Sequence, residues 1–136
     1  MQESVHQCRK ISEFDRLDMV GEGTYGVVFQ GKDRTNSQTY AIKKMRVLDQ
    51  SDGFPITSLR EIKILKKLSN HPNIVNLCDV VVDEKKDSIF LIFEYCDIDM
   101  AKLVEQMYID KLCFSEAEIK CMTLQILKGV FSQSPI

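Results

Sequence analysis

Alternating and continuous apolar positions in the first hundred residues predict a small β-sheet into which one helix is inserted. The apolar runs are rich in β-branched and aromatic residues and are separated by turn residues. Strands are expected at 14–20, 27–32, 39–45, 74–82 and 88–93. The last run is almost wholly apolar, which is typical of a central strand. Residues 1–12 are polar and are expected to form a flexible tail.

A helix is predicted at 55–68, where Pro55 suits a helix start and Ser58 and Glu61 have the spacing of a capping box. On a helical wheel its apolar residues fall on two sides. One side holds Ile56, Leu59 and Ile62, and the other holds Glu61, Ile64, Leu65 and Leu68. A surface helix needs only one apolar stripe, so the second stripe indicates contact with a partner protein. A helix buried on both sides within one domain remains the alternative.

Two further helices are predicted after the sheet. The first spans 100–107, and the second begins at Ser115, which has capping-box spacing with Glu118. The second helix carries an apolar stripe that includes Ile119, Ile126 and Val130. We interpret this stripe as a packing surface and not as a cofactor site.

Composition narrows the class of protein. The chain has 136 residues, 44% of them apolar and 28% charged, with a net charge of −2, so no nucleic-acid-binding surface is expected. The start has no apolar segment of the signal-peptide type, and the longest apolar run, 89–93, is too short to cross a membrane. The five cysteines show no C-x-x-C pairing, which indicates reduced intracellular thiols and makes a zinc site improbable. His71 has no second ligand nearby and is interpreted as a turn residue.

A glycine motif suggests the first chemistry. Gly21, Gly23 and Gly26 have the spacing G-x-G-x-x-G, in which bare backbone can approach phosphate groups. A Rossmann loop would open a helix, but 27–29 reads as a strand, and no P-loop Gly-Lys-Ser/Thr is present. A strand, glycine turn and strand of the kinase type therefore remain, with an ordinary glycine-tipped hairpin as the alternative.

The strand at 39–45 supplies a candidate phosphate ligand. Ala41 and Lys43 share one face, so Ala41 leaves room for a flat ligand while Lys43 reaches its phosphates. Lys44 points the opposite way and is the second candidate. Glu61 lies in the sheet-facing stripe of the helix, where a carboxylate needs a partner, and Lys43 is the natural one. The alternative is that Glu61 only caps the helix.

Together these motifs resemble the N-terminal part of a serine/threonine protein kinase of the cyclin-dependent kinase family. The resemblance covers about residues 12 to 130 and rests on Gly-Glu-Gly-Thr-Tyr-Gly, Ala-Ile-Lys, Pro-Ile-Thr-Ser-Leu-Arg-Glu and His-Pro-Asn-Ile-Val, in family order. The helix motif looks like that of the PITSLRE kinases. The segments 12–14 and 87–91 look similar to a neighbouring branch, whose helix reads Pro-Ile-Ser-Ser-Leu-Arg-Glu.

The resemblance implies an ATP site. Lys43 would bind the phosphates and pair with Glu61, these two being the catalytic residues that the chain contains. Phe93 would be the gatekeeper, and Asp99 would lie near the ribose. Glu94 and Cys96 would hydrogen-bond adenine through their backbones. The residues implied around ATP are Val20, Gly21, Glu22, Gly23, Thr24, Tyr25, Gly26, Val28, Ala41, Lys43, Phe93, Glu94, Tyr95, Cys96 and Asp99.

The resemblance also implies regulation and partners. Thr24 and Tyr25 match positions whose phosphorylation is inhibitory in the family. The helix at 55–68 would bind a cyclin, with Ile56 and Leu59 facing outward, and Arg60 would contact a phosphorylated activation loop. Protein substrates, but no nucleic acid and no membrane, are the further partners expected, and the family suggests an intracellular and preferably nuclear location.

The implied fold is α+β: a flexible tail at 1–12, a kinase N-lobe and hinge at 13–96, and the first helices of a truncated C-lobe at 97–136. The sequence contains no His-Arg-Asp, Asp-Phe-Gly or Ala-Pro-Glu motif, which would supply the catalytic base and the Mg²⁺ ligands. The chain alone is therefore expected to be inactive and to expose much of the stripe after Ser115. Three hypotheses remain: part of a longer kinase, a short protein that sequesters a cyclin, or a nucleotide-binding regulator.

Overall fold

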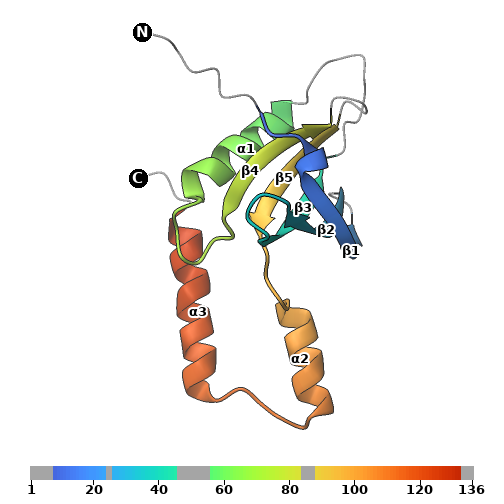
Figure 1. Ribbon diagram of the computed structural model, residues 1–136. Coiled ribbons are helices and arrows are strands. Elements are labelled where there is room, and N and C mark those ends of the chain that lie inside the picture. Colours follow the sequence, from blue (N-terminus) through green and yellow to red (C-terminus); the bar gives the residue numbers. More distant parts are fainter. Residues whose placement is uncertain (1–7, 24–25, 46–55, 84–87, 133–136) are drawn as a thin grey trace.

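A computed structural model of the chain describes residues 8–23, 26–45, 56–83 and 88–132. Five antiparallel strands form one sheet in the order β1-β2-β3-β5-β4. They are β1 (Phe14–Gly23), β2 (Gly26–Asp33), β3 (Thr39–Lys44), β4 (Leu77–Asp83) and β5 (Ser88–Glu94). A short 3₁₀ helix, η1 (Ile11–Glu13), precedes the sheet. The helices are α1 (Ile56–Leu68), which lies beside the sheet, and α2 (Met100–Ile109) and α3 (Glu116–Phe131), which extend away from it (Figure 1).

Side chains from the strands build a hydrophobic core on each face of the sheet, because neighbouring residues of a strand point to opposite faces. The first core consists of Phe14, Ile42, Val81, Phe90 and Ile92. The second consists of Met45, Leu77 and Leu91, against which Ile62 and Leu65 of α1 pack. The five-stranded sheet and the helix between its strands agree with the architecture expected from the sequence.

Helix α1 presents a different apolar face from the one that the helical wheel predicted. Ile62 packs against the sheet, although it was assigned to the outward side, and Ile64 is 56% exposed, although it was assigned to the sheet. Leu59 faces outward as expected and is 53% exposed. Ser58 lies within the helix and is not its cap, because the helix begins at Ile56. The side chain of Ile56 lies outside the described residues.

The turn between α1 and β4 is longer than predicted. Strand β4 begins at Leu77 and not at Ile74, because a turn at 72–73 is followed by irregular backbone up to residue 76. The Nδ1 atom of His71 accepts a hydrogen bond from the Asn73 backbone N–H at 3.1 Å, which confirms that His71 is a turn residue. Near the end of α3, Gly129 is buried against the same turn, where a Cβ would come within 3.0 Å of the Asn73 carbonyl oxygen.

Helices α2 and α3 are capped but carry exposed apolar side chains. Asp99 accepts a hydrogen bond from the Lys102 N–H, and Ser115 and Glu118 form the predicted capping box. Exposed apolar residues on and between the helices are Met100, Val104, Tyr108, Ile109, Leu112, Ile119, Leu124, Ile126, Leu127, Val130 and Phe131. No helix among the described residues has the length and apolar character that a membrane span requires.

Candidate functional site

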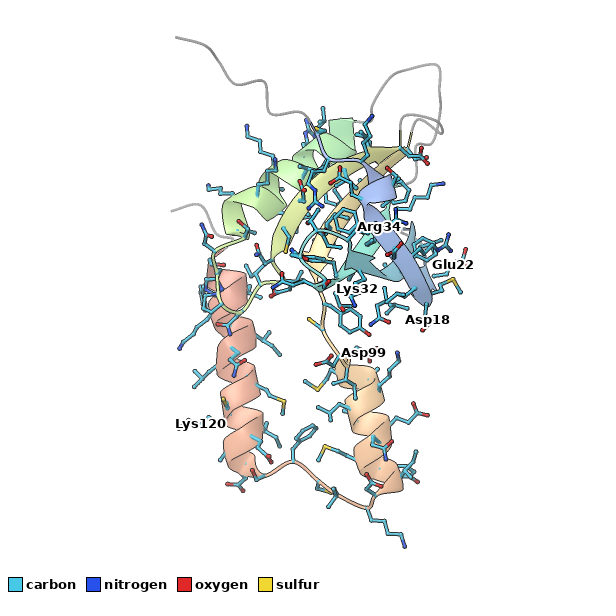
Figure 2. All side chains as sticks on the ribbon, in the orientation of Figure 1. Asp18, Glu22, Lys32, Arg34, Asp99 and Lys120 are labelled. Carbon is cyan, nitrogen blue, oxygen red and sulfur yellow. The ribbon has the colours of Figure 1, made fainter. Side chains whose placement is uncertain are left out.

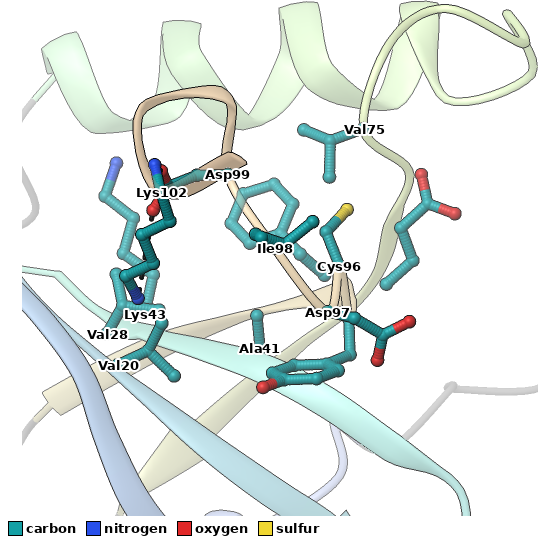
Figure 3. Close-up of a pocket in the computed structure, with 13 residues that line it drawn as sticks. Val20, Val28, Ala41, Lys43, Val75, Cys96, Asp97, Ile98, Asp99 and Lys102 are labelled. Atoms are coloured by element: carbon teal, nitrogen blue, oxygen red, sulfur yellow. Dashed lines mark hydrogen bonds and ion pairs between the residues drawn. The ribbon is translucent and has the colours of Figure 1, made fainter. Parts of the chain in front are cut away.

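A pocket of about 510 Å³ lies between the β1–β2 hairpin, the end of β5 and the start of α2 (Figure 3). Its size is in the range usual for small-molecule and cofactor sites. Its walls are mainly apolar and meet a few charged groups. The lining residues are Val20, Val28, Ala41, Lys43, Val75, Phe93, Glu94, Tyr95, Cys96, Asp97, Ile98, Asp99 and Lys102.

Strand register brings Ala41 and Lys43 into this pocket. Ala41 lies opposite Phe93 of β5, and Lys43 lies opposite Val28 of β2, so that three strands contribute to the same wall. Lys44, the second candidate for phosphate contact, is half-buried and does not line the pocket. The alternation predicted from the sequence therefore holds for these two lysines.

Lys43 and Glu61 form the ion pair that the sequence suggested. The Lys43 Nζ atom donates to Glu61 Oε1 at 2.8 Å, and the Lys43 side chain is only 19% exposed. Glu61 comes from α1, so the pair ties the helix to the pocket strand β3. A fixed ammonium group at the inner end of an apolar pocket is suited to bind an anionic oxygen.

The segment after β5 turns away from the sheet and forms the outer wall of the pocket. The Glu94 backbone N–H donates to the Asn76 carbonyl oxygen at 3.1 Å, and its carboxylate accepts from the Asn76 N–H at 2.7 Å. The Glu94 N–H is therefore engaged within the protein. Asp99 caps α2 through the Lys102 N–H at 2.8 Å, and its carboxylate lies 3.9 Å from Lys102 Nζ (Figures 2 and 3).

The pocket gathers most, but not all, of the residues that the resemblance implied. Nine of them line it: Val20, Val28, Ala41, Lys43, Phe93, Glu94, Tyr95, Cys96 and Asp99. Gly21, Glu22 and Gly26 of the hairpin do not line it, and the surroundings of Gly23 lie outside the described part of the chain. Thr24 and Tyr25, at the tip between β1 and β2, lie outside the described residues.

Four lining residues were not predicted: Val75, Asp97, Ile98 and Lys102. Val75 lies in the irregular segment between α1 and β4, and no local pattern could place it at the same pocket as residues 93–99. Lys102 had a usable signal, because it stands three residues after the cap residue Asp99, within the first turn of α2.

The described residues offer no site for a metal ion held by protein alone. No group of three or more His, Cys, Asp or Glu side chains in that part of the chain is arranged to hold one. The cysteines described are free. Partial burial raises the pKa of the Cys78 thiol, and the Glu94 and Asp79 charges raise it further. Cys78 thus keeps its proton more firmly than an ordinary cysteine does.

Comparison with known proteins gives the family. Residues 14–132 match the family described as "Protein kinase domain". The chain is 47% identical over 124 residues to "Cyclin-dependent kinase 10" of Homo sapiens, covering 91% of this chain and 33% of that protein. It is 44% identical over 123 residues to "Cyclin-dependent kinase G-2" of Oryza sativa subsp. indica, covering 90% of this chain and 17% of the relative.

A third relative is "Serine/threonine-protein kinase PITSLRE" of Drosophila melanogaster, 42% identical over 126 residues, with 93% of this chain and 13% of the relative covered. The chain thus spans a third or less of the length of these relatives. The sheet with its inserted helix, the Lys43–Glu61 pair and the pocket all lie within the matched region. The chain therefore belongs to the protein kinase family, as part of a kinase domain whose relatives are cyclin-dependent kinases.

Proposed function

We propose that these residues form the ATP-binding part of a cyclin-dependent-type serine/threonine kinase, which transfers the γ-phosphate of ATP to protein Ser or Thr. The observation that carries the proposal is the Lys43–Glu61 pair, 2.8 Å long, at the inner wall of an apolar pocket. A kinase needs such a lysine and glutamate pair to hold the phosphates.

The pocket residues divide naturally between the parts of ATP. Adenine would lie flat against Ala41 and between Val20 and Val28, since these small and branched side chains leave a slot. The Glu94 N–H already donates to the Asn76 carbonyl oxygen, so adenine at this edge would accept a hydrogen bond from the Cys96 N–H. Lys43 would neutralise phosphate charge, and Asp99 would accept from a ribose hydroxyl.

A binding experiment tests the ATP site directly. Titration of the 136-residue chain with ATP is expected to show saturable binding that Lys43→Met weakens at least tenfold, about 1.4 kcal/mol. Lys44→Met is the matched control, because the neighbouring lysine does not line the pocket. Equal ATP affinity of the Lys43→Met variant and the parent chain would overturn the site assignment.

Phosphoryl transfer needs groups that these residues do not supply. ATP would bring Mg²⁺ with its phosphates, but no cluster of His, Cys, Asp or Glu among the described residues fits a metal ion. The 136-residue polypeptide alone is expected to bind ATP without detectable transfer to a peptide substrate. Its Thr24 and Tyr25 would be sites at which phosphorylation opposes nucleotide binding by charge.

Helix α1 is the proposed cyclin-binding element. Leu59 and Arg60 are exposed on its outward side, where apolar surface is otherwise unexplained. Pull-down with a panel of purified cyclins is expected to capture the chain and to fail with Leu59→Glu. Ile64→Glu, at an equally exposed position off that face of the helix, is the matched control. Capture that survives Leu59→Glu would exclude this surface.

A second candidate function is a short, non-catalytic regulator that binds a cyclin or a nucleotide. It rests on the exposed Leu59 face and on the pocket, both of which exist without a catalytic loop. The intact mass of the endogenous product separates the candidates: a species near 15.7 kDa favours the regulator. A much larger species favours the kinase, for which nuclear localisation and cell-cycle or transcriptional roles are the accompanying expectations.

A further inference from the structure

The segment before β1 makes an unusual set of contacts on the sheet face away from the pocket. Residues 9–13, here called the strap, lie over the face that carries the first core, and Ile11 packs against that core. The pocket lies on the opposite face, because Ile42 points to the first core while its neighbours Ala41 and Lys43 line the pocket. The strap is therefore separate from the proposed nucleotide site.

The strap joins the two edges of the sheet. At one end, Lys10 forms a parallel bridge with Val82 of β4, and the Val82 N–H donates to the Arg9 carbonyl oxygen at 3.1 Å. At the other end, Glu13 leads directly into β1. Because the strand order is β1-β2-β3-β5-β4, β1 and β4 are the two outer strands. Figure 1 shows the blue segment crossing between them.

One side chain, Arg9, holds the strap in place. Its Nη1 atom donates to Asp33 Oδ2 at 2.9 Å and its Nε atom donates to Glu13 Oε2 at 2.8 Å. The guanidinium group also lies 4.8 Å from the centroid of the Phe14 ring. Asp33 is only 1% exposed, so its charge depends on this partner. Arg9 thus connects the strap to β2 and to the start of β1.

Two other features weaken the attachment of the strap to the sheet. One amino nitrogen of Arg9, Nη2, is buried and finds no hydrogen-bond partner among the described residues. An unsatisfied buried donor opposes burial of the whole group. The strap is joined to the sheet by one bridge to β4 and by the bond from the Arg34 N–H to the Glu13 carbonyl oxygen, whereas β3 and β5 beneath it pair over five successive residues.

We propose that residues 9–13 are a releasable strap that joins the two outer strands of the sheet, and that the ion pairs of Arg9 hold it there. Loss of the Arg9 contacts frees the Val82 backbone N–H at the outer edge of β4, while the sheet itself stays folded. Nothing in this device depends on ATP or on a cyclin, so its test is independent of the proposed function.

Amide hydrogen exchange followed by NMR tests the strap in the full chain. Arg9→Met keeps the apolar part of the side chain and removes the guanidinium group that bonds to Asp33 and Glu13. It is expected to raise exchange about a hundredfold for the Val82 amide, which bonds to Arg9, and for the Arg34 amide, which bonds to Glu13. The Met45 amide, bonded to Ile89 on the other core, should be accelerated by a clearly smaller factor than the Val82 amide, because the sheet stays folded when the strap opens.

Two further variants complete the experiment. Arg34→Met removes an exposed ion pair with Asp15 and should leave the Val82 amide protected. Arg9→Lys retains one charge, which cannot serve all three carboxylates near Arg9, those of Glu13, Asp33 and Asp79, and should give an intermediate rate; it also serves if Arg9→Met does not fold. Unchanged protection of Val82 in both Arg9 variants, or an equal rise at Met45, would overturn the proposal.

Discussion

At the scale of single residues, Asp33 shows how position decides ionisation. It accepts hydrogen bonds from Arg9 and from the backbone and hydroxyl of Thr35, although it is almost fully buried. The hydrogen bond from Arg9 is the main reason that the pKa of Asp33 lies well below its usual range, since burial alone would raise it. Nothing in the run Gly-Lys-Asp-Arg-Thr distinguishes this aspartate, because its partner is 24 residues away.

Acid titration of stability tests this assignment. A carboxyl whose folded pKa is depressed stabilises the fold above its unfolded pKa, near 3.9, and loses that contribution as the pH falls toward the folded value. The contribution of Asp33 to the free energy of unfolding should therefore be constant above about pH 4 and should decline below it. In Asp33→Asn, which removes the buried carboxylate while Arg9 keeps its bond to Glu13, stability near pH 7 should fall by about 2 kcal/mol and the acid decline should flatten. A decline of equal steepness in the variant would contradict the role of Asp33.

Gly26 is the residue of the glycine motif whose backbone geometry demands glycine. Its φ is +131°, and a Cβ there would lie 2.5 Å from the Lys44 carbonyl oxygen, which belongs to the neighbouring strand. Gly26→Ala should therefore lower the free energy of unfolding by about 2 kcal/mol or more. Gly21→Ala, with nothing within 4 Å of the added carbon, should change it little. Thermal denaturation of the two variants compares them, and equal melting temperatures would contradict this geometry.

At the scale of elements, the sequence predicted the strands and the α3 cap well but the inner face of α1 only in part. Strand positions followed from alternation and turn residues, which are local signals. Which face of α1 is buried depends on how the helix packs against the sheet. The helical wheel therefore placed Ile62 outward and Ile64 inward, whereas Ile62 contacts the core and Ile64 is exposed. The pocket wall at Val75 and Lys102 was missed for a related reason, because it is built from segments distant in sequence.

The cap of α3 offers a direct measurement at this scale. The Ser115 hydroxyl accepts from the Glu118 N–H at 3.3 Å, and the Glu118 carboxylate accepts from the Ser115 N–H at 2.8 Å. Ser115→Ala should cost about 1 kcal/mol of helix stability. Thr123→Ala, inside the same helix, removes a bond to the Ile119 carbonyl and should be neutral or slightly stabilising. Helicity followed by circular dichroism during heating distinguishes them, and equal effects would show that the cap contributes nothing.

At the scale of the whole molecule, two parts of the chain differ in how well they bury apolar surface. The sheet and α1 enclose two cores, whereas among the described residues α2 and α3 have only Gly129 fully buried. Local periodicity predicted a packing stripe on α3, but its apolar residues Ile119, Ile126 and Val130 are exposed, and periodicity could not say what they pack against. The relatives are at least three times as long as the matched region, so the stripe has candidate partners in the part of a kinase that these residues do not include.

Ile126 makes this difference measurable. It is 62% exposed on α3, so Ile126→Lys in the 136-residue chain should change the free energy of unfolding by less than about 0.5 kcal/mol. The same substitution should reduce binding of a hydrophobic dye and self-association in sedimentation, because it places charge in an apolar patch. Lys128→Gln, a polar change on the same helix, is the control. A loss of more than about 2 kcal/mol in Ile126→Lys would mean that this side chain is already covered within the short chain. In that case the surface would be an internal core of α2 and α3, and no further kinase segment would be needed to explain it.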